Sequence, residues 1–246
     1  MNATVRSADR ALMIFEAFEA AKCQLTLRDL AIRCDLPVSS CHGLVQTLLQ
    51  RGYLYSIGSR KELYPNSRIY SLAKTIVEND PFISRFSADL EALRNETNET
   101  VTVSKRHGDG LRYIYTLDSL RPVRYAAKPG DLRALHSTAN GKAILSMMSP
   151  DEFEQWVEGR ALESMTPRTI TTKEGLLQDL EKGRECGYFV AAGEYSIDLD
   201  AIAVPVELHN DFITISLAGP TQRVAPLLSD FAQRLLAIKQ KLEASI

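Results

Sequence analysis

Small polar residues at a predicted helix start give this sequence one candidate site for an anion. The run Ser137-Thr138-Ala139-Asn140-Gly141-Lys142 follows Leu135 and opens a helix that extends to about Met148. The first turn of a helix has free backbone N–H groups and the positive end of the helix dipole, so it can hold a carboxylate. An ordinary capped helix has the same composition, and both interpretations stay open at this point.

A second set of polar side chains belongs to the helix that is predicted after Pro37. Apolar residues recur there at helical spacing from Cys41 to Leu48 and form one buried face. The opposite, outward face is formed by Ser39, Ser40, His42, Gly43 and Gln46. Hydroxyl, imidazole and amide groups can hydrogen-bond to base edges in the major groove of DNA. An antiparallel helix pair with a solvated outer face would show the same pattern.

The elements around this helix have the order of a winged helix-turn-helix. Thr26 and Asp29 form a capping-box pattern that opens a first helix, which must end before Pro37 because proline disfavours helical angles in the preceding residue. Residues 52–57 and 62–64 predict a hairpin with a basic turn, a wing able to reach a phosphate or the minor groove. The candidate DNA-binding residues are Thr26, Ser39, Ser40, His42, Gln46, Arg60 and Lys61.

Charge is distributed unevenly along the chain. Residues 1–76 contain ten Lys and Arg against six Asp and Glu, a net charge of +4, and the remaining residues have a net charge of −6. A basic N-terminal part on a mildly acidic body is the charge distribution expected of a protein that binds DNA through its N-terminal part.

Length and composition indicate an ordinary globular protein of two unequal domains. The chain has 246 residues, of which 45% are hydrophobic. No apolar run approaches the roughly 20 residues that span a bilayer, and the amino terminus has no apolar signal segment. The four cysteines show no paired spacing, which is typical of a reducing compartment, so we expect a cytoplasmic protein.

A linker helix is predicted between the two domains. Residues 67–79 have one apolar stripe, formed by Ile69, Leu72, Ala73, Ile76 and Val77. This stripe should pack either on the wing domain or on the same helix of a second subunit, and the second arrangement would give a two-fold dimer. The expected boundaries are therefore 1–66 for the DNA-binding domain, 67–80 for the linker helix and 81–246 for the larger domain.

The larger domain mixes strands and helices in a way that predicts an α+β fold with a largely antiparallel sheet. Expected strands lie at 101–103, 111–117, 122–127, 188–191, 201–208 and 212–217. Expected helices lie at 82–95, 138–148, 150–157 and 173–185, and a long amphipathic helix ends the chain.

Signatures of enzymes and of metal sites are weak. Gly141-Lys142 resembles the end of a phosphate-binding loop, but His136 stands where that motif needs glycine and Ala143 where it needs Ser or Thr. The histidines are dispersed, so no metal site, no cofactor and no catalysis are expected. Two alternatives stay open. One is a small-molecule enzyme that uses its helical head for assembly, with the serines and Glu194 as its only candidate groups. The other is a DNA-binding regulator whose sensory domain is vestigial or binds a protein.

Short motifs along nearly the whole chain resemble the IclR family of bacterial transcriptional regulators. In the N-terminal part they are Arg10-Ala11-Leu12, Leu36-Pro37, Ser39-Ser40, His42 and Gly52-Tyr53. In the larger domain they are Glu99-Thr100-Val101, Leu135-His136, Ala139, Gly141-Lys142-Ala143, residues 166–171, Gly187-Tyr188, Glu194, residues 202–206 and Ala218-Gly219-Pro220. Each motif is short, but their order and spacing together are specific.

The resemblance implies a winged helix-turn-helix, a linker helix and a GAF-like domain that binds a small organic acid effector. It also implies a homodimer or a dimer of dimers that binds a double-stranded DNA operator and controls a catabolic operon. The effector-binding residues that it implies are Thr138, Ala139, Asn140, Gly141, Ala191, Glu194, Ala201, Ser216 and Ala218.

The sequence departs from the family pattern at a few positions. Gly43 stands where members commonly have an arginine in the recognition helix, and Asp198 replaces a usual glycine near the pocket loop. Ala191 and Ala201 occupy positions that are polar in some members. A pocket that is roomier and less acidic than one built for a two-carbon or three-carbon acid follows, and we therefore expect a medium-sized, partly apolar carboxylate such as an aromatic acid.

Overall fold

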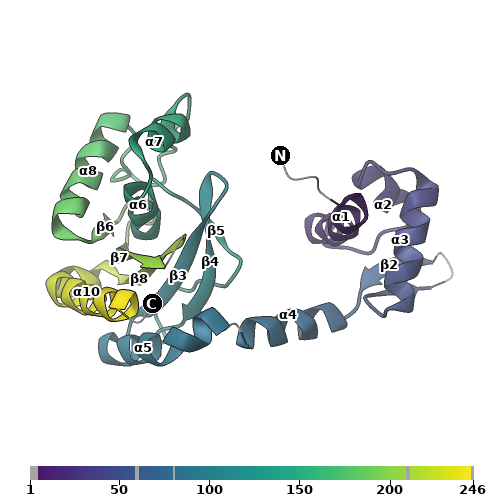
Figure 1. Cartoon of the computed structure of the whole chain (residues 1–246), viewed down its shortest axis with the longest axis horizontal. Helices are drawn as coiled ribbons and strands as arrows, with labels where there is room; N and C mark the ends of the chain where they lie inside the picture. The colour runs from purple at the N-terminus through teal and green to yellow at the C-terminus, as the bar shows by residue number, and fades with distance from the viewer. Residues whose placement is uncertain (1–4, 59–60, 80, 209–210, 245–246) are drawn as a thin grey trace. The chain divides into compact units, whose positions relative to one another are not determined.

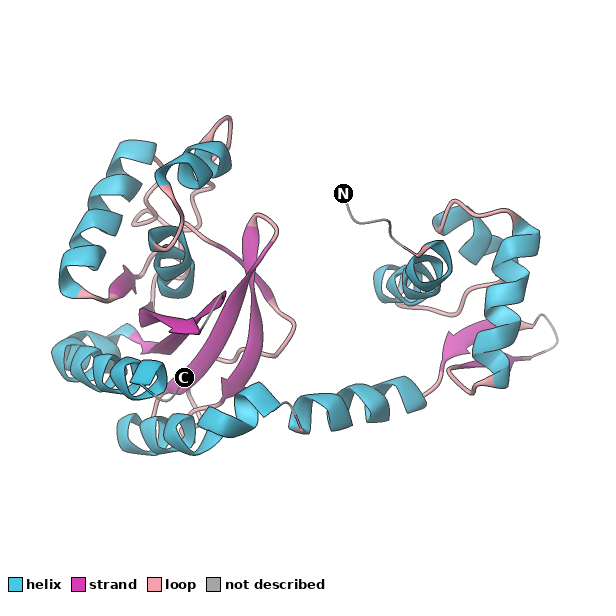
Figure 2. Ribbon diagram, viewed as in Figure 1, coloured by secondary structure: helices cyan, strands magenta, loops and turns pink. Residues whose placement is uncertain are grey.

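The chain forms two compact units, each with its own hydrophobic core. The computed structural model describes residues 5–58, 61–79, 81–208 and 211–244. Contacts divide it into Met1–Pro81 and Phe82–Ile246, which Figures 1 and 2 show as a small helical unit and a larger unit built on a sheet. None of the helices within the described ranges combines the length and the hydrophobicity that a membrane span requires.

The N-terminal unit consists of helices and one hairpin. Its elements in chain order are α1 (Arg6–Ala21), α2 (Leu27–Arg33), α3 (Val38–Gln50), β1 (Leu54–Ile57), β2 (Glu62–Pro65) and α4 (Arg68–Glu78). The core contains Ile14 and Phe18 from α1, Leu30 from α2 and Val45 from α3. The predicted helix-turn-helix and wing are thus present, and α1 packs behind them.

The linker helix α4 presents its apolar side chains to solvent within the single chain. Tyr70 and Ile76 are 68% and 61% exposed, and Leu72 and Val77 are each 45% exposed. Four of the five residues of the predicted stripe, Leu72, Ala73, Ile76 and Val77, are therefore exposed in one copy of the chain, while Ile69 is half-buried. The packing partner of the stripe stays a prediction.

The C-terminal unit is built on a six-stranded sheet with the order β5-β4-β3-β8-β7-β6, in which every neighbouring pair is antiparallel. The strands are β3 (Thr100–His107), β4 (Gly110–Leu117), β5 (Leu132–Ala134), β6 (Phe189–Ala192), β7 (Leu199–Leu208) and β8 (Asp211–Pro220). The longest pairing joins β7 and β8 from Leu199↔Pro220 to Leu208↔Asp211. The predicted α+β fold with a largely antiparallel sheet is confirmed.

Helices cover both faces of this sheet (Figure 1). One face carries α6 (Ala139–Ser146), α7 (Pro150–Val157) and α8 (Lys173–Cys186), and the other carries α5 (Pro81–Thr97) and α10 (Leu228–Ala244). Two short turns, α9 (Thr221–Val224) and η1 (Ala225–Leu227), connect β8 to α10. Side chains alternate along the strands, so Val101 and Val103 face α5 and α10 while Thr102 faces α6.

One predicted strand is wrong and one strand was not predicted. Residues 122–127 form no ladder; the Thr100 hydroxyl instead donates to the Tyr125 carbonyl at 2.6 Å and ties the segment to the sheet through a side chain. The edge of β4 pairs with β5, whose three residues are too few to show a strand periodicity.

Candidate nucleic-acid interface and ligand cavity

The helix-turn-helix is fixed by a capping box and a tight turn. The Thr26 hydroxyl accepts from the Asp29 backbone N–H at 3.2 Å, and the Asp29 carboxylate accepts from the Thr26 N–H at 2.9 Å. After α2 the chain reverses at Asp35, which has a φ of 49°. The Leu36 N–H donates to the Ala31 carbonyl and closes the turn. These local bonds set the direction in which α3 leaves the turn.

The predicted DNA-contacting face of α3 is open to solvent. Ser39, His42 and Gln46 are exposed and Ser40 is half-buried, while Cys41, Val45 and Leu48 are buried beneath them. Helical spacing therefore separates a polar outer face from an apolar inner one, as predicted.

The other candidate DNA contacts differ in their availability. The Thr26 hydroxyl is already engaged in the capping box, where it also donates to the Asp29 carboxylate at 2.7 Å. Lys61 is exposed at the start of the return strand with a φ of 51°, whereas Arg60 lies outside the described residues. The hairpin is anchored by a two-way backbone pairing between Leu25 and Leu63 at 3.1 and 2.8 Å.

The C-terminal unit contains a cavity between the start of α6 and the sheet. Twelve residues line it: Tyr113, Tyr125, Ser137, Thr138, Ala139, Asn140, Ala191, Tyr195, Leu199, Ala201, Ser216 and Ala218. Seven of them are among the nine candidate effector-binding residues, which come from α6, β6, β7 and β8. The fold thus brings together segments that lie up to 80 residues apart in the chain.

The start of α6 leaves one hydroxyl without a partner. The Thr138 side chain caps the helix by accepting from the Gly141 N–H at 3.1 Å and donates to the Ala134 carbonyl at 2.9 Å. Ser137 is fully buried, lines the cavity, and its Oγ has no hydrogen-bond partner. A buried hydroxyl that is left unpaired costs about 1–3 kcal/mol, so this atom would gain from a bound polar group.

A buried ladder of hydroxyls lies beneath the cavity on the sheet. Thr102 pairs with Ser216 at 2.7 Å, and Ser104 pairs with Thr214 at 2.6 Å. The Asn140 amide Nδ2 donates toward these pairs, most closely to Ser104 at 3.0 Å. The Asn140 side chain is therefore held by hydroxyls of the sheet while it also lines the cavity.

Three tyrosines form the aromatic wall of the cavity, and none was among the predicted site residues. The Tyr113 and Tyr125 hydroxyls lie 3.3 Å apart, and the Arg133 guanidinium lies 5.6 and 5.4 Å from the ring centroids of Tyr113 and Tyr195. Burial, reinforced by Tyr125, raises the pKa of the Tyr113 phenol well above its usual value, so this phenol keeps its proton. The spacing in the expected strand at 111–117 predicts Tyr113 and Tyr115 on one side of the sheet. This prediction is wrong, because Tyr113 packs in the core beneath α6 and Tyr115 packs against the opposite core.

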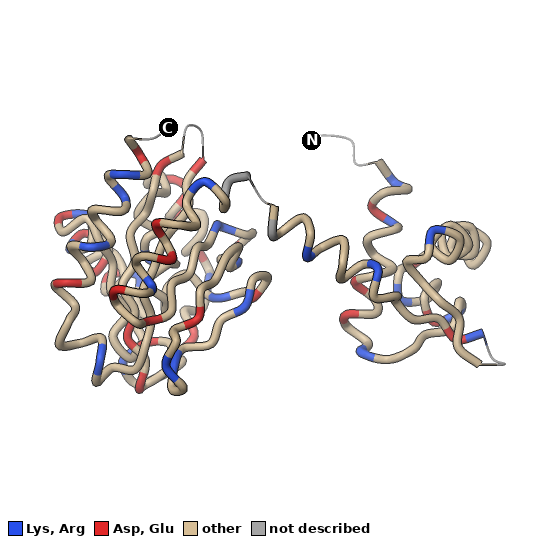
Figure 3. The backbone as a smooth tube through the Cα atoms, turned by 90° about the horizontal axis from the view of Figure 1, so that it is seen from below, with Lys and Arg blue, Asp and Glu red and all other residues tan. Residues whose placement is uncertain are grey.

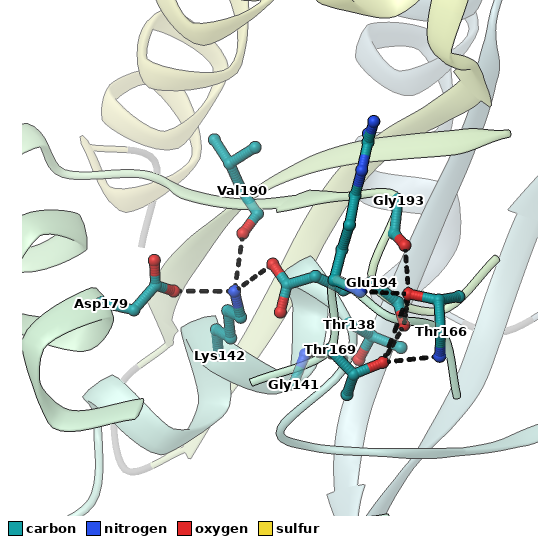
Figure 4. Close-up of polar contacts among 10 residues, drawn as sticks. Thr138, Gly141, Lys142, Thr166, Thr169, Asp179, Val190, Gly193 and Glu194 are labelled. Carbon is teal, nitrogen blue, oxygen red and sulfur yellow. Dashed lines mark hydrogen bonds and ion pairs between the residues drawn. The ribbon is translucent and has the colours of Figure 1, made fainter. Parts of the chain in front are cut away.

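Glu194 and Gly141 were expected to contact an effector, but neither lines the cavity. The Glu194 carboxylate Oε1 instead accepts from the fully buried Lys142 Nζ at 2.6 Å (Figure 4). The same ammonium lies 2.7 Å from Asp179 and donates to the Val190 carbonyl at 3.0 Å. Gly141 packs directly against the Leu135 backbone, where a Cβ atom would not fit. This glycine therefore allows the two backbone segments to lie close together.

The loop around Glu194 is tied down by two threonines of the 166–171 motif. The Thr166 hydroxyl donates to the Gly193 carbonyl at 2.6 Å, and the Thr169 hydroxyl donates to the Glu194 carbonyl at 2.7 Å (Figure 4). Burial raises the pKa of the Glu194 carboxyl, Lys142 opposes this rise, and Asp179 adds to it. Its second oxygen, Oε2, is buried without a partner. This cluster therefore ties down the loop in which Glu194 precedes Tyr195, a residue of the cavity lining.

Among the described residues, no group of three or more His, Cys, Asp or Glu side chains is arranged to hold a metal ion. The arrangement in the C-terminal unit is a small cavity with a neutral lining, a helix start and an unpaired hydroxyl. Such a cavity can bind a small anion through hydrogen bonds.

Comparisons with known proteins agree with both units. Residues 7–58 match the IclR helix-turn-helix domain, and residues 74–243 match the domain described as bacterial transcriptional regulator IclR C-terminal. The Escherichia coli repressor AllR is 26% identical over 218 residues, which cover 88% of this chain and 80% of AllR. The Escherichia coli regulator KdgR is 27% identical over 226 residues, which cover 91% of this chain and 86% of KdgR.

A solved structure shares the fold over almost its whole length. It is an IclR homologue from Microbacterium hydrocarbonoxydans complexed with 4-hydroxybenzoate, with a TM-score of 0.76 and 21% identity over 97% of this chain and 99% of the homologue. Because the two domain matches together span most of the sequence, the chain belongs to the IclR family of bacterial transcriptional regulators.

Proposed function

We propose that this regulator binds its operator through the outer face of α3 and the β1–β2 hairpin, and that a carboxylate ligand in the cavity modulates this binding. The observation that carries the proposal is the buried, unpaired Ser137 hydroxyl beside the start of α6. A carboxylate oxygen there would accept from the hydroxyl and face the positive end of the helix dipole.

The lining of the cavity favours an aromatic acid over a very small one. Tyr113, Tyr125 and Tyr195 offer ring faces and edges against which an aromatic ligand can pack. Ala191 and Ala201 contribute only methyl groups to the lining. The Microbacterium homologue, which was solved with 4-hydroxybenzoate, supports a ligand of this class.

The same lining supports binding rather than catalysis. Its polar side chains are hydroxyls and one amide, and the described lining contains no Asp, Glu, His, Cys or Lys. A serine nucleophile needs an adjacent base, which this set does not supply. We expect no cofactor and no turnover of bound acids.

On DNA, we propose that two copies act together. The uncovered apolar side chains of α4 support a two-fold dimer, alone or within a dimer of dimers. Such a dimer would place two α3 helices in successive major grooves about 34–36 Å apart, with Ser39, His42 and Gln46 near base edges. A ligand can change this affinity only by binding one arrangement of the dimer more tightly, and about 1–3 kcal/mol of coupling is typical.

The ligand part of the proposal is tested by calorimetric titration of the full chain with 4-hydroxybenzoate, benzoate and glyoxylate. We expect the aromatic acids to bind and Ser137→Ala to weaken them about tenfold, because that variant removes a charge-assisted hydrogen bond. Ser146→Ala, at the other end of α6, is the matched control and should bind normally. Tight binding of glyoxylate without binding of either aromatic acid would contradict the proposal.

The DNA part is tested by selecting bound fragments from the host genome and measuring their affinity with and without the acid. We expect affinity to fall steeply with salt, because condensed counterions are released on binding. An affinity that is indifferent to ionic strength would contradict it.

A further inference from the structure

The recognition helix of this regulator has no charged side chain. From Val38 to Gln50, α3 contains neither Lys, Arg, Asp nor Glu. In Figure 3, α3 is seen end-on as a tan coil, while α1, the helix that follows the N-terminus, has blue segments near its start. Much of the affinity of a protein for DNA comes from Lys and Arg at phosphates, so the cations that accompany α3 must belong to other elements.

An open groove between α1 and α3 places two arginines beside the recognition helix. Its described lining includes Arg6 and Arg10 from α1, which are four residues apart and so share one face of that helix. The α3 side of the groove includes Ser39, Ser40, Gly43 and Thr47, and the lining contains no acidic residue. Positive charge and hydroxyls thus converge on one strip of surface.

Gly43 forms a bare part of this groove, and packing within the chain does not require it. A Cβ added there would meet nothing within 4 Å, and its φ is not positive. Glycine in a helix interior is less stable than alanine, so the glycine has a local cost without a local benefit. Absence of a side chain does allow a bound group to approach the backbone of α3 closely.

We propose that this groove holds a phosphate of the DNA backbone, with Arg6 and Arg10 as its cationic contacts and Gly43 providing the space. The inference rests on the operator binding proposed above. It assigns to α1 the phosphate contacts that an uncharged α3 lacks, and it leaves Ser39, His42 and Gln46 to read bases. The contact is positioning rather than sequence-specific, because phosphates are the same at every base pair.

The test measures the affinity of the full chain for two probes, a genomic fragment selected by the unchanged protein and a random-sequence duplex of equal length. Arg6→Ala and Arg10→Ala should each weaken both probes by about tenfold. Each should also reduce the slope of log affinity against log salt, and the double variant should reduce it by about one per bound protomer, because one phosphate contact is then lost. Arg6→Lys should retain the slope, because it keeps the charge. Lys182→Ala, which removes an exposed cation from the C-terminal unit, is the matched control and should leave both quantities unchanged.

Gly43→Ala and Gly43→Gln separate loss of binding from loss of folding. Both replace glycine with a better helix former, so the melting temperature should stay the same or rise. DNA affinity should fall nevertheless, and more for the glutamine, which fills the groove.

Three results would overturn the inference. The first is unchanged affinity and salt slope in both arginine variants. The second is a loss confined to the selected fragment, which would indicate base reading rather than a phosphate contact. The third is full DNA affinity in Gly43→Gln. Failure of the unchanged protein to bind any duplex would instead refute the proposed operator binding.

Discussion

The helices α3 and α6 both carry small polar residues, but their surroundings are opposite. Only Cys41, Val45 and Leu48 of α3 are buried, whereas every residue of α6 from Ala139 to Leu145 is buried. An exposed polar face can meet a partner as large as a duplex, while an enclosed helix start can meet only what fits its cavity. The same residue types therefore serve different kinds of ligand because of how much of each helix the fold covers.

The largest expected effect concerns the buried ion cluster behind α6. Lys142→Met should destabilise the protein by about 3–5 kcal/mol near neutral pH, because it leaves Glu194 buried without its counter-charge. Urea unfolding measures this cost, and Lys182→Met on the exposed face of α8 is the control. A cost below about 1 kcal/mol would mean that the cluster is not closely packed.

The pH dependence of that variant follows from Glu194. Its pKa is raised in the folded protein by burial, and without Lys142 the main opposing influence is lost. A carboxyl whose folded pKa is raised stabilises the fold at low pH, and that contribution disappears as the pH rises through the folded pKa. The cost of Lys142→Met should therefore shrink as the pH is lowered from about 8 toward 5. A cost that grows on acidification would contradict this assignment.

The next effect compares the glycines of the two helices. A Cβ at Gly141 would lie 2.2 Å from the Leu135 carbonyl oxygen, so Gly141→Ala should cost about 3 kcal/mol. Gly43→Ala, where nothing lies within 4 Å, should instead stabilise by up to about 1 kcal/mol. Thermal and urea unfolding of both variants measure the difference. Equal changes in the free energy of unfolding for Gly141→Ala and Gly43→Ala would contradict the difference in packing between α6 and α3.

The smallest effect compares two amides. Asn140→Ala should destabilise by about 2 kcal/mol, since it removes a buried donor from the hydroxyls of Ser104 and Thr214. Gln46 is exposed, so Gln46→Ala should change the free energy of unfolding by less than about 0.5 kcal/mol. The same variant should weaken operator binding. Urea unfolding and DNA affinity are measured for each variant. A loss of stability in Gln46→Ala, or unchanged stability in Asn140→Ala, would contradict these assignments.

The N-terminal unit was largely predictable because its signals are local. The capping box at Thr26 and Asp29, the stop before Pro37 and the spacing of Cys41, Val45 and Leu48 each involve residues within one or two helical turns. Bonds and spacing of this kind depend on residues a few positions apart, so they can be recognised directly in the sequence.

The cavity was predictable only where the family resemblance supplied residues. Seven of the nine candidates line it, but the resemblance also included Glu194, whose carboxylate the fold turns toward Lys142. The tyrosine wall was missed because Tyr125 lies in a segment with no ladder and Tyr195 in a loop after β6. Nothing in the spacing of these residues indicates that they meet.

Most of the longer helices, their starts and their apolar faces could be predicted from the sequence, since these features depend on neighbours three or four residues away. The folded structure was needed to show which polar groups are left unpaired, as Ser137 is, and which bare surface remains open, as at Gly43. Both depend on segments distant in the chain. A side chain is paired or free only with respect to what the fold places against it.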